Sequence, residues 1–195
     1  MGLRLLRKAR DLKESIVSGG GDRRDFLLKK LPKNSICAEV GVWKGTLSKR
    51  IIKLTKPKRL ILIDAWASDM MHDNSDVQNL TQNDFDLLYS NVLKKFSDND
   101  EVEIIRKNSK EAVKIFPDEY FDWIYIDASH HYEDVLQDLE LARLKVKKGG
   151  IIAGDDYINA VGKWGLDVIK AVDNFAKKYG LHVESINNQF IIKLP

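Results

Sequence analysis

Short apolar runs alternate along the chain with longer stretches in which apolar residues recur at helical spacing. The runs that we expect to form buried strands are residues 36–40, 59–64, 102–106, 121–127 and 150–154. Helical spacing marks a stretch ending at residue 54 and residues 84–96, 109–115, 132–146 and 163–179. Because near-continuous apolar strands alternate with helices, the pattern predicts an α/β fold with parallel strands covered by helices on both faces.

The last two apolar runs follow a different rule. Residues 181–186 and 189–194 are separated only by Asn187-Asn188, and a two-residue Asn link is typical of a tight antiparallel hairpin. We therefore expect a mostly parallel, seven-stranded sheet that ends in an antiparallel hairpin. The polar residues 65–83 lack periodicity and predict a long loop.

The N-terminal 31 residues are expected to be a helical extension, with the main domain at residues 32–195. Three glycines, residues 19–21, end the first predicted helix, and a second short helix at residues 22–31 is expected to end before Pro32. The first helix is basic and mildly amphipathic. We expect it to pack on the domain or on a second subunit, as in a homodimer, while contact with a membrane surface stays the alternative.

Composition narrows the class of protein. The 195 residues are 44% hydrophobic and 31% charged, which is typical of one globular domain. The net charge of +3 gives no reason to expect nucleic acid as a partner. With Cys37 as its one cysteine the chain has no internal disulfide, no apolar run reaches the ~20 residues of a membrane span, and we expect a cytoplasmic protein.

A glycine turn follows the first predicted strand. Glu39 ends that strand, Gly41 allows a sharp turn, and Gly45 is expected to let the next helix pack closely on the sheet. Asp64 ends the second strand, where an acid can accept hydrogen bonds from ribose hydroxyls. The dinucleotide fingerprint is broken because Trp43 replaces its second glycine, so a nucleoside ligand with an amino-acid portion fits better than a pyrophosphate. An ordinary strand-to-helix turn is the alternative.

This segment resembles the first motif of class I S-adenosylmethionine-dependent methyltransferases, and the resemblance runs from about residue 36 to the end of the chain. It implies a Rossmann-like fold in which Glu39, Gly41 and Gly45, with Trp43 in the same turn, surround the methionine part and Asp64 holds the ribose. The missing dinucleotide fingerprint and the terminal hairpin argue against a NAD-dependent oxidoreductase.

Three further residues are candidates for the adenine site by the same resemblance. Trp66 is expected to flank the adenine ring, and a core tryptophan is an equally good interpretation. Asn108 and Ser109 follow the third strand at the position that contacts adenine in this class. A helix N-cap is the alternative role for Ser109.

A second group of polar residues follows the fourth and fifth strands. Asp127 and His130 come after one strand, and Asp155 and Asp156 come after its neighbour. Three carboxylates at one edge would repel each other unless something positive lies between them. A divalent cation such as Mg²⁺, held by Asp127, Asp155 and Asp156, would supply that charge. Solvated loop acids or helix caps are the alternative.

This second group resembles the metal-dependent O-methyltransferases of the catechol and caffeoyl-coenzyme A type. Asp156 replaces the asparagine of that pattern, a departure shared with a branch that acts on sugars in macrolide antibiotics and with cephalosporin-hydroxylase-like proteins. In the Asp-x-Ser-His phrase of that branch the histidine is the base, a role that falls on His130, with Asp127 beside it. His131 is expected to begin a helix or to support the site.

The resulting hypothesis is metal-dependent O-methylation of a small polyhydroxylated acceptor, such as a sugar or a glycosylated metabolite. A metal-free methyltransferase is one alternative. A binding or hydrolytic protein on the same scaffold is another, because a fold does not fix a function. The acceptor pocket is expected from residues 66–83, the N-terminal helices and residues 157–164, in which Tyr157 and Trp164 are either lining or core residues.

Overall fold

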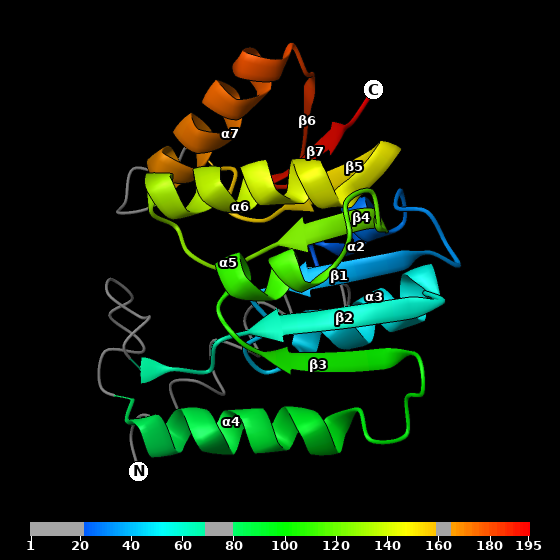
Figure 1. Cartoon of the computed structure of the whole chain (residues 1–195), viewed down its shortest axis with the longest axis vertical. Helices are drawn as coiled ribbons and strands as arrows, with labels where there is room; N and C mark the ends of the chain where they lie inside the picture. The colour runs from blue at the N-terminus through cyan, green and yellow to red at the C-terminus, as the bar shows by residue number, and fades with distance from the viewer. Residues whose placement is uncertain (1–21, 69–79, 159–164) are drawn as a thin grey trace.

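The computed structural model describes residues 22–68, 80–158 and 165–195 (Figure 1). Seven strands form a sheet in the order β3-β2-β1-β4-β5-β7-β6. The neighbouring pairs among β1 to β5 are parallel, β7 runs antiparallel to β5, and β6 runs antiparallel to β7. The strands are β1 Ile36–Val40, β2 Arg59–Asp64, β3 Val102–Arg106, β4 Phe121–Ile126, β5 Val146–Gly154, β6 Val183–Ile186 and β7 Gln189–Lys193. The predicted sheet is confirmed.

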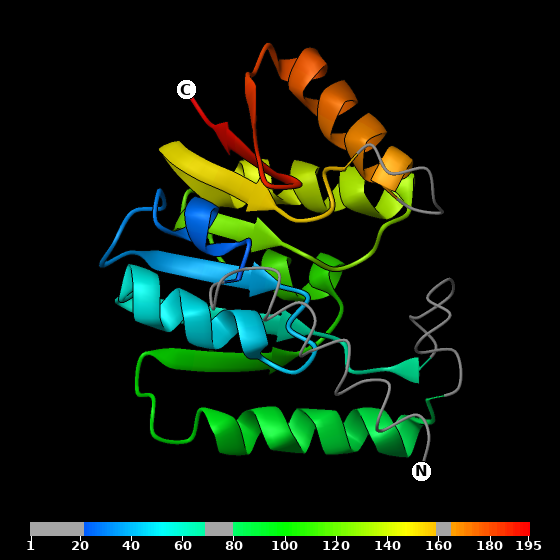
Figure 2. The same ribbon diagram turned by 180° about the vertical axis from the view of Figure 1, so that it is seen from behind.

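Helices cover both faces of this sheet. Figure 1 views the face covered by α5 and α6, and Figure 2 views the opposite face, covered by α2 and α3. The helices are α2 Asp25–Leu28, α3 Thr46–Thr55, α4 Gln82–Lys95, α5 Ser109–Ala112, α6 Tyr132–Lys145 and α7 Gly165–Tyr179, with a 3₁₀ helix, η2, at Val113–Ile115. Helix α4 begins at Gln82, two residues before the predicted start, and Thr81 caps it with a reciprocal hydrogen-bond pair to Asp84.

Two apolar clusters follow from the alternation of side chains along the strands. On β1, Ala38 and Val40 pack with residues of α5, α6 and α7, whereas Cys37 packs with residues of α2, α3 and α4. Alternation places Glu39 on the same face as Cys37. A carboxylate is thereby inserted into an otherwise apolar face, close to the carboxyl end of the strand.

The N-terminal extension differs from the prediction. The helix expected at residues 22–31 is reduced to α2, because the Asp22 carboxylate accepts a hydrogen bond from the Arg24 amide and makes a turn there. Leu27 and Leu28 are fully buried in the cluster that includes α3. The first predicted helix lies outside the described residues.

The terminal hairpin confirms the expected turn. Asn187 and Asn188 have φ angles of 49° and 67°, so both central residues adopt the left-handed conformation of a type I′ turn. The hairpin places Phe190 of β7 beside Gly154 of β5, next to the end of β5 that carries Asp155. Among the described residues, no helix is both long enough and apolar enough to cross a membrane.

Candidate functional site

The glycine turn after β1 is shaped by its neighbour β4. Gly41 has a φ of 91°, and a Cβ atom there would lie 2.0 Å from the backbone oxygen of Asp127. The Asp127 amide donates to the Val40 carbonyl at 2.7 Å. Glycine is therefore required at position 41 because two loop backbones meet there, and the ends of β1 and β4 form one continuous site.

Gly45 has a different neighbour from the one expected. It is the N-cap of α3 with a φ of 66°, and a Cβ atom there would lie 2.7 Å from the ring of Phe96 at the end of α4. Leu47 in the same turn is buried with residues of β1 and β2, so this helix start does pack on the sheet, although the Cβ position of Gly45 faces Phe96 rather than a strand. The close contact is with the Phe96 ring, which occupies the space a side chain would need.

Asp64 organises the turn through its carboxylate. Its Oδ2 accepts hydrogen bonds from the amides of Val42 and Trp43, at 2.9 and 2.8 Å, and its Oδ1 accepts one from the Trp66 amide at 2.8 Å. A carboxylate has about four acceptor positions, and Asp64 is partly exposed. Acceptor capacity therefore remains for a hydroxyl group of a ligand.

The two tryptophans at this edge have unequal access to solvent. Trp66 is 0% exposed, packs against Tyr89 and donates its Nε1–H to the Trp43 carbonyl at 2.9 Å. This is the environment that the core-tryptophan interpretation expects. Trp43 is partly exposed. Both have left-handed backbones, with a φ of 55° at Trp43 and 41° at Trp66. Such backbone strain is concentrated at functional sites.

Glu39 is the most unusual group in the turn. Its side chain is 1% exposed, and neither carboxylate oxygen has a hydrogen-bond partner. The hydroxyl of Ser48 on α3 makes no regular hydrogen bond either, but it lies close enough to the carboxyl group to lower the pKa of Glu39. Burial is the largest influence and raises the pKa of Glu39 to about 8, because it and the charge of Asp127 outweigh the opposing effects of the Ser48 hydroxyl and the charge of Arg24. An unpartnered buried carboxylate costs folding free energy, which is the property of a group that awaits a polar or cationic ligand.

Asn108 and Ser109 follow β3 at the same edge of the sheet. Asn108 is the N-cap of α5 and accepts a hydrogen bond from the Glu111 amide at 2.9 Å. The capping role considered for Ser109 therefore belongs to Asn108. The Ser109 hydroxyl instead donates to Asp138 of α6 at 2.6 Å, and burial raises the pKa of Asp138 to about 6.

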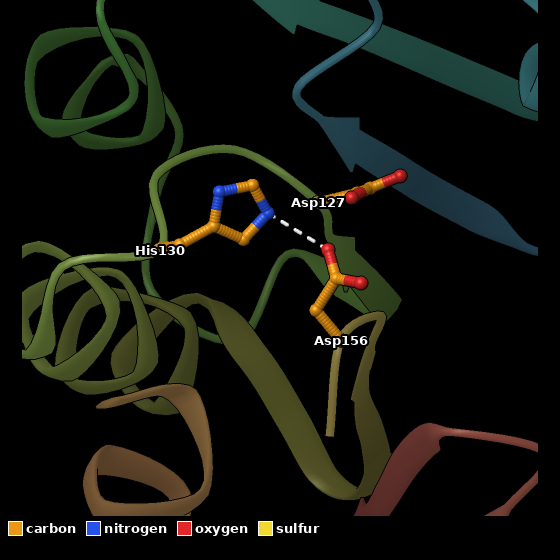
Figure 3. A group of neighbouring side chains, drawn as sticks. All are labelled: Asp127, His130 and Asp156. Carbon is orange, nitrogen blue, oxygen red and sulfur yellow. Dashed lines mark hydrogen bonds and ion pairs between the residues drawn. The ribbon is translucent and has the colours of Figure 1, made fainter. Parts of the chain in front are cut away.

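The acidic group lies at the ends of β4 and β5 (Figure 3). Nε2 of His130 is 2.7 Å from Oδ2 of Asp156, and Asp156 has a strained φ of 57°. One ligand atom from each of Asp127, His130 and Asp156 lies within 4.8 Å of the other two, a separation that would suit a metal ion. The structure thus brings together two of the three predicted metal ligands and adds the histidine.

Asp155, the third predicted ligand, is turned toward an arginine. Its side chain is 4% exposed, and its Oδ1 lies 2.6 Å from Nη1 of Arg23. Arg24 lies 3.5 Å from Oδ2 of Asp127 and 4.0 Å from Oδ2 of Asp155. The sequence analysis missed both arginines. The sequence shows them only as two adjacent basic residues before α2. No hydrophobic or polar pattern in the sequence predicts that this segment lies beside the end of β5.

The charges in this cluster move the pKa values in opposite directions. Burial and the charges of Asp155 and Asp156 raise the pKa of Asp127 to about 7. Burial opposes protonation of His130, but the hydrogen bond and charge of Asp156 outweigh it and raise the pKa of His130. Burial opposes ionisation of Asp156, but the hydrogen bond to His130 and the charges of His130, Arg23 and Arg24 together outweigh burial and lower the pKa of Asp156. His130 and Asp156 therefore form a polarised pair, which is suited to accept and hold a proton.

The fold and the two groups at its carboxyl edge define the class of a class I S-adenosylmethionine-dependent methyltransferase. Residues 38–157, more than half of the chain, match the Methyltransf_24 family of methyltransferase domains. The chain belongs to this family. No curated protein matches the sequence significantly.

Solved structures share this fold at low sequence identity. The O-methyltransferase NovP has 18% identity and a TM-score of 0.63, with 89% of this chain and 80% of that chain covered. A SAM-dependent methyltransferase from Aquifex aeolicus has 16% identity and a TM-score of 0.57, covering 88% and 90%. Fibrillarin from Aeropyrum pernix, with natively bound S-adenosyl-L-methionine, has 14% identity and a TM-score of 0.54, covering 87% and 72%. At these identities the likeness concerns the fold.

Proposed function

We propose that this chain transfers the methyl group of S-adenosylmethionine to a hydroxyl oxygen of a small polyhydroxylated acceptor, such as a sugar or a glycosylated metabolite. The observation that carries the proposal is the buried carboxylate of Glu39, which makes no regular hydrogen bond. The loop that follows it meets the loop of His130 where Gly41 contacts Asp127, and His130 is paired with Asp156. The first group fits a cationic cofactor and the second fits a base. Together they fit methyl transfer to a hydroxyl oxygen.

The residues present fit the cofactor. Glu39 would accept hydrogen bonds from the ammonium group of the methionine part, which would relieve the cost of its unpartnered burial. The partly exposed Asp64 would accept from a ribose hydroxyl, and Asn108 and Ser109 lie after β3 where the adenine is expected. When bound, the cofactor supplies an electrophilic methyl group on a sulfonium ion. Trp66 offers no exposed ring face in this conformation.

On the acceptor side, His130 takes the proton of the attacking hydroxyl. Asp156 orients the imidazole ring and stabilises its positive charge, the arrangement that general-base catalysis requires. A small cavity beside His130 is also lined by Val135, Val168 and Phe190. Most of the rate enhancement would then come from positioning the oxygen in line with the methyl group.

The metal-dependent form of this reaction is the second candidate. It is favoured by the approach of Asp127, His130 and Asp156 to within a distance at which one ion can contact all three. A divalent cation held there would lower the pKa of a bound hydroxyl group. The charge argument that predicted the metal is weakened, however, because Arg23 and Arg24 already place positive charge among the acids.

Transfer of a labelled methyl group to a panel of sugars, glycosides and catechols tests the proposal. We expect turnover with polyhydroxylated acceptors, and we expect it to persist in the presence of a chelator. Loss of turnover with the chelator and its recovery with Mg²⁺ would select the metal-dependent form. Calorimetric titration with S-adenosylmethionine comes first, because the absence of measurable binding would exclude methyl transfer in either form.

The N-terminal segment and the location of the protein stay predictions. We propose a cytoplasmic protein that forms a homodimer through its first predicted helix, supported by the basic, amphipathic pattern of that helix. Light scattering on the full chain, and on a variant that lacks residues 1–18, distinguishes a dimer made by this helix from a monomer.

A further inference from the structure

We propose that Arg23 and Arg24 are the resident cations of the Asp127–Asp155–Asp156 cluster and compete with a divalent metal ion for its carboxylates. This inference goes beyond the proposed function, because it assigns the charge balance of the site independently of the acceptor. It also makes Arg23 and Arg24, which precede α2, part of the candidate site.

The contacts of the two arginines are distributed over all three acids. Arg23 pairs with Asp155 at 2.6 Å and approaches Asp156 at 4.0 Å. Arg24 approaches Asp127 at 3.5 Å and Asp155 at 4.0 Å. Asp155 is almost fully buried, and an ionised carboxylate in that position requires a nearby cation. The guanidinium groups meet this requirement.

Both arginines make further hydrogen bonds that fix their side chains, although the Arg23 side chain is 41% exposed. Arg24 donates two hydrogen bonds to the Asp22 carboxylate, from Nε at 3.0 Å and from Nη2 at 2.8 Å. This is the two-pronged geometry that guanidinium and carboxylate groups favour. The Arg24 side chain is only 20% exposed. Its position is therefore fixed by the turn at Asp22, the same turn that shortens α2.

The terminal hairpin holds Arg23. The Arg23 guanidinium donates to the Asn187 carbonyl at 3.0 Å, and the Arg23 carbonyl accepts from Nε2 of Gln189 at 3.4 Å. Gln189 is fully buried and is itself held by the hydroxyl of Tyr125 at 2.9 Å. Elements that are far apart in the sequence thus cooperate to present one arginine to Asp155.

The consequence for a metal ion is direct. Asp127, His130 and Asp156 are the group that could contact one ion. Arg24 approaches Asp127 and Arg23 approaches Asp156, so a divalent cation held by this group would lie near both guanidinium groups. Like charges at such separations repel strongly in a partly buried site. Metal binding therefore requires the arginines to move away, and their removal should make the site a better metal site.

Manganese binding, followed by electron paramagnetic resonance of free Mn²⁺, tests this competition in the full chain. We expect the Arg23→Gln/Arg24→Gln protein to bind Mn²⁺ at least tenfold more tightly than the wild type. We also expect Mn²⁺ to raise the melting temperature of the double variant more than that of the wild type. Arg59→Gln is the matched control, because Arg59 pairs with Glu103 at the opposite edge of the sheet, and it should match the wild type.

A second variant keeps the test decisive if the double variant does not fold. Arg23→Gln alone removes the cation that pairs with Asp155 and keeps Arg24 with its Asp22 partner, so it should also tighten Mn²⁺ binding. Affinities within twofold of the wild type in these variants would overturn the proposal, as would tight Mn²⁺ binding that weakens when the arginines are removed. Binding of S-adenosylhomocysteine is measured in parallel. Its absence would count against the proposed function, while the Mn²⁺ comparison would still decide the role of the arginines.

Discussion

Glu39 and Asp155 are both buried carboxylates near strand ends at one edge of the sheet, yet their surroundings are opposite. Glu39 is 1% exposed and has no hydrogen-bond partner, whereas Asp155 is 6% exposed and is bound by Arg23 and by the Asp156 amide. Desolvation is costly for both. An acidic cluster is therefore not evidence for a missing cation until its protein partners are known, whereas a buried acid without a regular hydrogen bond or ion pair is a candidate ligand-binding group.

Gly41, where the two regions touch, carries the largest expected effect. Gly41→Ala would direct a methyl group at the Asp127 carbonyl oxygen and impose a left-handed backbone on alanine. We expect this variant to lose about 3–5 kcal/mol of unfolding free energy, measured by urea denaturation. Cofactor binding should be lost with it.

The matched control for Gly41→Ala is Gly149→Ala. Gly149 has a similar left-handed φ of 71°, but no atom lies within 4 Å of the Cβ position. We expect a cost of about 1 kcal/mol from the backbone alone. Equal effects at the two positions would mean that the contact between the β1 and β4 loops is unimportant.

The acceptor region has its own expected effect, on turnover rather than on stability. His130→Gln and Asp156→Asn should each lower kcat by about 10²–10⁴-fold, the usual contribution of a general base. Their affinity for S-adenosylhomocysteine should stay within about twofold of the wild type. If either variant lost cofactor affinity but kept its kcat, the His130–Asp156 pair would serve cofactor binding rather than proton transfer, which would contradict the proposal.

The pattern of the chain predicted the sheet and the edge at which the site lies, because strand periodicity and strand-end chemistry are local properties. It placed Glu39, Gly41, Asp127 and Asp156 correctly at that edge. It missed the arginine contacts with Asp155 because they depend on how the segment before α2 docks against β5 and the hairpin, which no local pattern specifies. The burial of Trp66 likewise follows from the packing of α4, not from its own neighbours in sequence.

A smaller effect is expected on the pH dependence of stability. Burial raises the pKa of Glu39 to about 8 and that of Asp127 to about 7, so the folded state retains protons that the unfolded chain has already released. The unfolding free energy should therefore fall as the pH rises from about 5 to about 8. Denaturation at several pH values should give a flatter profile for Glu39→Gln. A stability that rises over this range would contradict the burial of these acids as ionisable groups.

The most direct test of the central claim, that the unpartnered Glu39 carboxylate is a cofactor-binding group, is calorimetric titration of S-adenosylmethionine into the wild type and Glu39→Gln. We predict that the wild type binds and that Glu39→Gln binds about 10–100-fold more weakly, the range expected for one charge-assisted hydrogen bond. At pH 8 the same variant should be at least as stable as the wild type when free of ligand. Equal affinities for the two proteins, or no binding to the wild type, would contradict the account.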